Sequence, residues 1–214
     1  MKKPSENKIV PLYAIFPLLV VVIYNFLVYC GARWLVRDSV HYNFETPLDE
    51  SVPLVSWTVY IYLLAYVFWI IGYILATRFD REQAYRFCLA DLIGKTVCLI
   101  FFVFLPCTLS RPEITGGGFT DRVVALVYRV DKADNLFPSI HCFVSYLCFL
   151  GVKNNPKIPK SYRVFSFIFA VAICISTLTV KQHVIYDAVA GIALAYMCYY
   201  LSGAIVRIKN KKMG

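Results

Sequence analysis

Long apolar runs separated by short basic segments constrain the fold of this chain more than any other feature of its sequence. Of its 214 residues, 59% are hydrophobic and only 16% are charged, which is too little polar surface to cover a soluble domain. Such a composition is typical of a helical protein that spans a bilayer several times. Six spans are expected, at residues 9–34, 54–76, 87–109, 139–152, 164–180 and 184–206.

Basic residues are concentrated between the apolar runs, and the chain has a formal net charge of +9. The positive-inside rule accounts for this excess, so no nucleic-acid partner is expected. The basic leader 1–8, loop 153–163 and tail 207–212 then lie in the cytoplasm, and the acidic loop 36–53 lies outside. We therefore predict an all-α polytopic membrane protein, a single domain over residues 1–214 whose six transmembrane helices form one bundle with both termini cytoplasmic. Its expected location is the plasma (cytoplasmic) membrane.

The longest connection, residues 110–137, lies on the outer side in this topology. It begins with Ser110-Arg111-Pro112 and contains the glycine run 116–118, which is typical of a hinge. Apolar residues then recur at helical spacing between residues 119 and 130, with charged residues between them. This pattern predicts a short amphipathic helix, capped by Thr120 or Asp121, that lies flat at the outer membrane interface.

Two of the three histidines stand at the edges of apolar runs, where an ionisable group is costly and is functional by default. His141 lies at the start of the fourth run, and His183 precedes the sixth. The 41 residues between them allow one helix inward, a turn and one helix back. His183 and Asp187 are four positions apart and so share one helix face. The topology brings both histidines and Arg111 to the same, non-cytoplasmic side.

These residues predict nucleophilic catalysis on phosphorus. Asp187 can hold one ring nitrogen of His183 and leave the other to attack, which forms a covalent phosphoenzyme. His141, when protonated, can donate its proton to the departing alkoxide. Candidate phosphate-binding groups are the guanidinium of Arg111 and the backbone N–H groups of Ser139 and Ile140 at a helix N-terminus.

At these residues the chain resembles the type 2 phosphatidic acid phosphatase superfamily, whose motifs are K-x6-R-P, P-S-G-H and S-R-x5-H-x3-D. Ser110-Arg111-Pro112 matches the end of the first motif, and Pro138-Ser139-Ile140-His141 matches the second with isoleucine in place of glycine. Ser176, His183 and Asp187 match the third at the required spacing. The resemblance implies a six-helix fold with its active site at the outer face, and it adds Ser176 to the phosphate-binding candidates.

Two cations of these motifs are missing from the chain. The first lysine would fall at Phe104, and the arginine of the third motif falls at Thr177. Lys181 is the nearest replacement for a phosphate-binding cation. The pattern without these cations is also similar to the inositol phosphorylceramide synthase branch, in which a hydroxyl group instead of water accepts the phosphoryl group. The identity of the acceptor is therefore open at this point.

The resemblance implies an integral membrane phosphatase that hydrolyses a lipid phosphate or pyrophosphate at the extracytoplasmic face through a phosphohistidine intermediate. Its catalytic motifs lie in residues 110–141 and 176–187. One alternative is a phosphotransferase that uses the same nucleophile, and another is a non-enzymatic membrane scaffold that kept the fold. No cofactor or metal is expected, because His, Cys and carboxylate residues do not cluster at ligand spacing. The expected partners are the lipid phosphate substrate and the bilayer, and the oligomeric state is open.

Overall fold

Residues 9–213 are described by the computed structural model, and helices dominate them. Residues 1–8, which form the predicted basic leader, and residue 214 lie outside this range. The helices are α1 (Leu12–Leu35), α2 (Pro47–Ser51), the 3-10 turn η1 (Ser56–Thr58), α3 (Val59–Arg78), α4 (Arg81–Phe104), α5 (Phe119–Val130), α6 (Ile140–Val152), α7 (Lys160–Thr179) and α8 (Ile185–Met213). Two short strands, β1 (Tyr42–Asn43) and β2 (Cys107–Thr108), form a parallel pair.

Five helical segments are long and apolar enough to cross a membrane: Leu12–Leu35, Ser56–Arg78, Arg81–Phe104, Lys160–Thr179 and Ile185–Lys209. Large apolar side chains on them, such as Phe16, Phe26 and Ile70, point outward, as lipid-facing residues do. The prediction of an all-α protein with several membrane spans is therefore confirmed. The count of six spans and the side on which the termini lie stay predictions.

Helix α6, the fourth predicted span, is shorter than the other five. Its 13 residues rise only about 20 Å, less than the roughly 30 Å of a hydrocarbon core. It packs against α3, α4, α7 and α8, and most of its residues are buried. Because other helices surround it in place of lipid, α6 does not need the length of a lipid-facing span.

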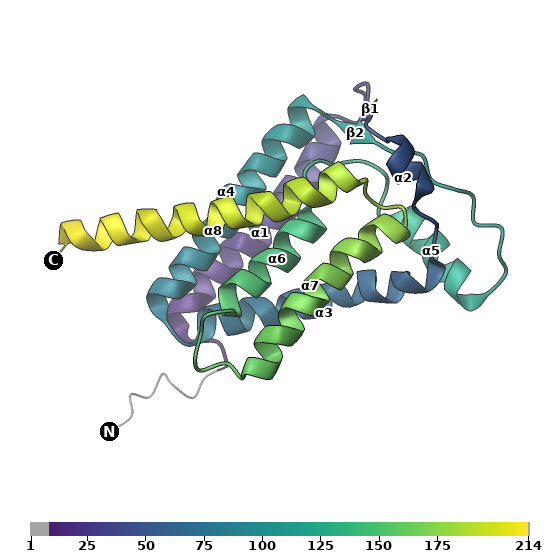
Figure 1. Ribbon diagram of the computed structural model, residues 1–214. Helices are drawn as coiled ribbons and strands as arrows, with labels where there is room; N and C mark the ends of the chain where they lie inside the picture. Colours follow the sequence, from purple (N-terminus) through teal and green to yellow (C-terminus); the bar gives the residue numbers. More distant parts are fainter. Residues whose placement is uncertain (1–8, 214) are drawn as a thin grey trace.

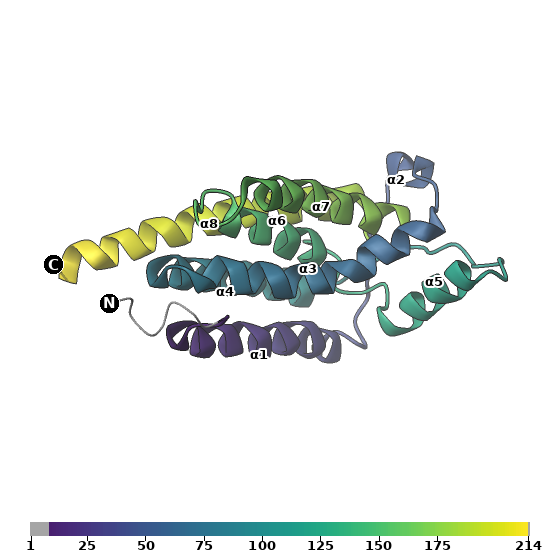
Figure 2. The same cartoon turned by 90° about the horizontal axis from the view of Figure 1, so that it is seen from below.

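The helices form a layered bundle around α6 (Figure 1). In the turned view, α1 is the outer layer next to α4, while α7 and α8 lie on the opposite side of the bundle (Figure 2). The start of α1 and the end of α8 lie at one end, and α2 and α5 lie at the other (Figure 2). The start of α6, which includes His141, and the turn before α8, which includes His183, also lie at the end with α2 and α5 (Figure 1).

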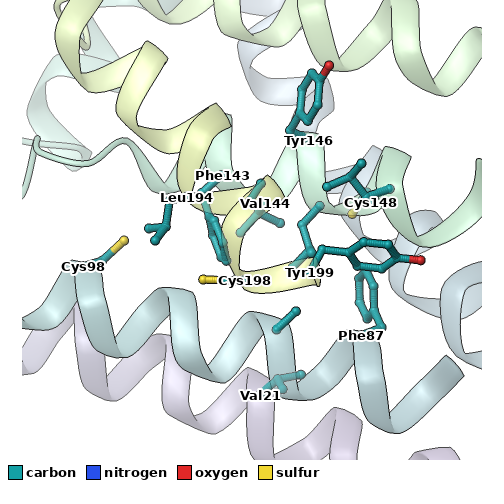
Figure 3. Close-up of a cluster of buried hydrophobic side chains, with 14 of the residues drawn as sticks. Val21, Phe87, Cys98, Phe143, Val144, Tyr146, Cys148, Leu194, Cys198 and Tyr199 are labelled. Atoms are coloured by element: carbon teal, nitrogen blue, oxygen red, sulfur yellow. The ribbon is translucent and has the colours of Figure 1, made fainter. Parts of the chain in front are cut away.

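The core fixes α6 against its neighbours through close contacts at small residues. The ring of Phe143, which is fully buried, lies against Leu194 and Cys198 of α8 (Figure 3). On its other side the same ring occupies the space that a Cβ atom on Gly94 of α4 would need. A well-packed core of this kind resists displacement, so the start of α6 has one position relative to α4 and α8.

Three predicted boundaries need correction. The third predicted span corresponds to α4, which begins at Arg81 and not at residue 87, because the Asp80 side chain accepts a hydrogen bond of 2.6 Å from the Gln83 N–H and caps the helix. It ends at Phe104, five residues before the predicted end, and the chain continues into β2. The amphipathic helix α5 was expected to be capped by Thr120 or Asp121, but its N-cap residue is Gly118, with no side-chain cap.

Candidate active site

His183 and Asp187 form the centre of the candidate site, at the turn from α7 into α8. Lys181 takes a left-handed conformation, with φ of 56°, which turns the chain back on itself. The N–H groups of Gln182 and His183 then both donate to the carbonyl of Thr177, at 2.9 and 3.1 Å. His183 Nδ1 lies 3.2 Å from Asp187 Oδ2, the same oxygen that accepts from the Val184 N–H at 3.1 Å. The pairing at Nδ1 leaves Nε2 as the nitrogen available for attack.

Asp187 also raises the pKa of His183. Burial by itself lowers the pKa of His183, but the hydrogen bond and the negative charge of Asp187 outweigh it, so the pKa lies above the ordinary value of 6.5. Both side chains are largely shielded from water, with 9% of His183 and 1% of Asp187 exposed. The carboxylate therefore stabilises the cation that forms when the imidazole attacks.

His141 lies beside His183, as predicted from the topology. Its ring centroid is 6.1 Å from that of His183. Ser139 caps α6, because its hydroxyl accepts from the Cys142 N–H, and its own N–H donates to the carbonyl of Asp187 at 3.1 Å. This last bond joins the start of α6 directly to the start of α8. It also uses the Ser139 N–H that was expected to bind phosphate.

Three aromatic rings of α3 surround His141. The ring of Tyr62 is stacked on it at 4.4 Å, and those of Trp69 and Tyr66 lie at 5.0 and 5.8 Å. These contacts fix the orientation of the His141 imidazole next to His183. The sequence predicted neither these contacts nor the role of α3 in the site.

Arg111 is held in one orientation at the end of α5. Its Nη1 donates to the carbonyls of Asp131 and Tyr128, at 2.8 and 3.3 Å, and its Nη2 donates to the Gln182 side-chain oxygen. Burial lowers the pKa of Arg111, although the charge of Asp131 opposes this shift. An arginine remains a cation in proteins, so the site keeps a fixed positive charge next to the turn that carries His183.

A second carboxylate, Asp131, belongs to the site and was not predicted. It follows α5 directly and accepts hydrogen bonds from the hydroxyls of Tyr29 in α1 and Tyr62 in α3. Burial by itself raises the pKa of Asp131, but the charges of His141 and His183 and the two tyrosine hydrogen bonds place it below its ordinary value. Asp131 is therefore an anion close to both histidines. Its tyrosine partners are remote in sequence, so no local pattern marked it.

The remaining predicted residues are engaged elsewhere. Lys181 Nζ donates to the carbonyl of Asp49, at 2.8 Å, and the Ser176 hydroxyl donates to the carbonyl of Ile173 within α7. Ile140 is the first residue of α6. Of the two positions that lack a motif cation, Phe104 is 80% exposed and Thr177 is fully buried. Among the described residues, no hydrogen bond or ion pair joins Lys181 or Ser176 to Arg111 or His141.

A short strap formed by residues 42–51 covers the start of α8. Its β1 strand pairs with β2, and a capping box between Thr46 and Asp49 begins α2. Asp49 Oδ1 accepts from the Ile185 N–H at 2.8 Å. A small cavity between the strap and the turn is lined by His183, Lys181, Glu45 and Asp49, among others. His183 is thus reached from the end of the bundle at which the strap lies.

The fold and the site together define a class, helical membrane proteins that carry a paired histidine and aspartate at one end of the bundle. A family model described as the PAP2 superfamily matches residues 34–201. The chain therefore belongs to the PAP2 superfamily, and the resemblance seen in its motifs is confirmed at that level. This membership suggests a membrane enzyme of the phosphatase type. A comparison with curated proteins finds no match.

No group of three or more His, Cys, Asp or Glu side chains within residues 9–213 could hold a metal ion. The eight cysteines are free thiols, and all but Cys30 are buried.

Proposed function

We propose that this protein is an integral membrane phosphatase that hydrolyses a lipid phosphate or pyrophosphate through a phosphohistidine at His183. The observation that carries the proposal is the pairing of His183 with Asp187 at 3.2 Å, with His141 on the adjacent helix start. A nucleophile, a carboxylate that orients it and a proton donor are the three groups that this reaction needs. Membership of the PAP2 superfamily supports the same chemistry.

The reaction takes two steps. First, the lone pair on Nε2 of His183 forms a bond to phosphorus while the bond from phosphorus to the lipid oxygen breaks, and His141 donates a proton to that oxygen. Then water attacks phosphorus, His141 takes a proton from the water, and the bond between phosphorus and nitrogen breaks to release phosphate. Asp187 keeps its negative charge throughout and stabilises the charged ring. Arg111 neutralises the oxygens that do not react.

The orientation in the membrane belongs to the proposal. The topology has six spans with α6 as the fourth, both termini in the cytoplasm and the active site on the outer face. In this topology the charges of all loops agree with the positive-inside rule. The single domain 1–214 then lies in the plasma membrane, and its lipid substrate enters from the outer leaflet. Helix α5, with Phe119, Leu126 and Val130 exposed on it, supports an interfacial helix beside the site.

A phosphotransferase similar to inositol phosphorylceramide synthases is the second candidate function. The observation that favours it is the lack of two motif cations. Neither Phe104 nor Thr177 supplies one, and Lys181 is bound to the Asp49 carbonyl. The nucleophile and the first step are the same, but a hydroxyl group of a second molecule replaces water in the second step. The two candidates differ only in the acceptor.

Phosphate release from a panel of lipids tests the proposal. The purified protein is incubated, with a metal chelator present, with phosphatidic acid, a polyprenyl pyrophosphate, phosphatidylglycerophosphate or a sphingoid phosphate. Hydrolysis predicts free phosphate from a single lipid substrate. Transfer predicts a second phospholipid product that forms only when an acceptor is added. A protein that does neither with any donor would be the non-enzymatic scaffold.

A further inference from the structure

Gln182, the residue before the proposed nucleophile, is buried in an unusual way. Only 2% of it is exposed, and its side-chain oxygen accepts a hydrogen bond from Arg111 Nη2. A guanidinium has donors and no acceptor, so the atom that faces Arg111 must be the oxygen. The amide nitrogen, Nε2, points away from Arg111. It is buried and has no hydrogen-bond partner among residues 9–213.

Two further nitrogens of the same site share this property. Six buried polar side-chain atoms lack both a hydrogen-bond and an ion-pair partner in the described part of the chain, and Gln182 Nε2, Arg111 Nε and His141 Nε2 are three of them. Buried polar groups are nearly always hydrogen-bonded, because leaving one unpaired costs about 1–3 kcal/mol. A bound group with several acceptor oxygens, such as a phosphate, would provide hydrogen-bond partners for these three nitrogens.

We propose that the Gln182 amide donates a hydrogen bond to a phosphoryl oxygen of the substrate. It acts together with Arg111 Nε, and the two groups take the place of the cations absent at Phe104 and Thr177. The inference rests on the proposed function, since it assigns a residue to the same reaction. The neighbouring basic side chain, Lys181, donates to the Asp49 carbonyl and does not take this role. Gln182 and His183 are also tied to one carbonyl, that of Thr177, so the donor and the nucleophile are held by the same turn.

A simpler role for Gln182 is to orient Arg111. Replacement by methionine in the wild type and in an Arg111→Met background separates the two roles. Methionine is similar in length to glutamine, has no N–H donor and adds no charge, whereas a glutamate would repel an anion whichever role Gln182 has. If Gln182 only orients Arg111, Gln182→Met changes the affinity for an anion in the wild type but not in the Arg111→Met background. If Gln182 is a donor, the affinity falls in both backgrounds.

The experiment measures binding of orthovanadate, a phosphate analogue, to the purified full chain by isothermal titration calorimetry. For Gln182→Met, the loss of a hydrogen bond to a charged group predicts a Kd about 10- to 100-fold higher than that of the parent protein in each background. The matched control is Gln83→Met, since Gln83 is the only other glutamine and bonds to the Gly151 carbonyl and the Tyr199 hydroxyl away from the site. The control is expected to bind as the wild type does. Thermal unfolding confirms that each variant is folded.

Gln182→Leu serves as the second variant if Gln182→Met does not fold, and it should weaken binding to a similar extent. Wild-type affinity in a folded variant, or no effect in the Arg111→Met background, would overturn the inference. Turnover of His183→Asn separates this result from a failure of the proposed function. If His183→Asn keeps full turnover while Gln182→Met weakens vanadate binding in both backgrounds, the anion site is right and the nucleophile is wrong. If His183→Asn is inactive while Gln182→Met binds normally, the nucleophile stands and the role of Gln182 is wrong.

Discussion

A single carboxylate, Asp187, sets both the orientation and the charge of the proposed nucleophile. It contacts Nδ1 of His183 at 3.2 Å and is itself held by the Val184 N–H at 3.1 Å. Its charge and hydrogen bond outweigh the effect of burial on the pKa of His183. The acid limb of the pH dependence should therefore be set by His183 through its contact with Asp187.

We expect the rate to rise with pH through a pKa above 6.5, because only neutral His183 can attack and its pKa is raised. Asp187→Asn removes the charge and the hydrogen bond that raise the pKa of His183, and leaves burial, which lowers it. The acid limb of the profile should therefore move to lower pH. The rate above the limb should also fall by on the order of 10³–10⁴, as for other histidines that lose an orienting carboxylate. A profile of kcat/KM against pH measures both effects.

Asp38→Asn is the matched control, because Asp38 is an exposed carboxylate paired with the neighbouring Arg37. It should leave the profile unchanged. An acid limb in Asp187→Asn at the same pH as in the wild type would show that Asp187 does not set the pKa of His183.

Helices α6 and α8 are the elements that hold the two histidines at a fixed separation. They approach closely at Gly191, where an added Cβ atom would lie 2.5 Å from the Ser139 carbonyl oxygen and 3.1 Å from the Phe143 nitrogen. Backbone atoms cannot move aside as the end of a side chain can. The distance between His141 and His183 therefore depends on the absence of a side chain at residue 191.

Gly191→Ala should push α8 away from α6 and lower kcat by about 100-fold, the cost of a displacement of roughly 1 Å between reacting groups. Gly31→Ala, in α1, is the control because nothing lies within 4 Å of its added Cβ. Kinetics of both variants with one substrate provide the measurement. Equal activities would mean that the packing of α6 on α8 does not position the site.

Helix α4 carries a buried ion pair that the proposed reaction does not use, between Lys95 and Asp91 at 2.9 Å. The pair matches the four-residue spacing of the two side chains in the sequence, and Tyr73 of α3 donates to Asp91. Lys95→Met leaves the aspartate without its partner and should destabilise the fold by about 3–5 kcal/mol. Adding Asp91→Leu to Lys95→Met should restore most of that loss. Thermal unfolding in detergent tests both, and a double variant as unstable as Lys95→Met would contradict the interpretation.

For the molecule as a whole, local patterns predicted the helices and the motif pairs but not the contacts that complete the site. The apolar runs predicted six spans, five of which correspond to helices long and apolar enough to cross a membrane, and the four-residue spacing of His183 and Asp187 predicted their pairing. Asp131 could not be found in this way, because its partner Tyr29 is 102 positions away and the two meet only through packing. Lys181 was predicted to bind phosphate, but its side chain contacts the strap, whose position no local signal reveals.

The proposed orientation predicts which loops face the outside of the cell. In a Cys30→Ser background, which removes the exposed native thiol, Glu50→Cys and Lys157→Cys place single exposed thiols in the strap and in the basic loop before α7. A membrane-impermeant maleimide added to intact cells should label Glu50→Cys at once and Lys157→Cys only after permeabilisation. The opposite pattern would put the active site in the cytoplasm.

In the proposed mechanism His183 carries the phosphoryl group, and trapping of the phosphorylated protein tests this directly. The wild type, His183→Asn and His41→Asn are mixed with the lipid of the panel that the wild type turns over, labelled with ³²P at the transferred phosphate, and quenched in alkali. His41 is the third histidine of the chain; it lies outside the helices, and its Nδ1 contacts the Ser39 carbonyl. We predict alkali-stable, acid-labile label on the wild type and on His41→Asn, and none on His183→Asn. Equal labelling of His183→Asn would contradict the account.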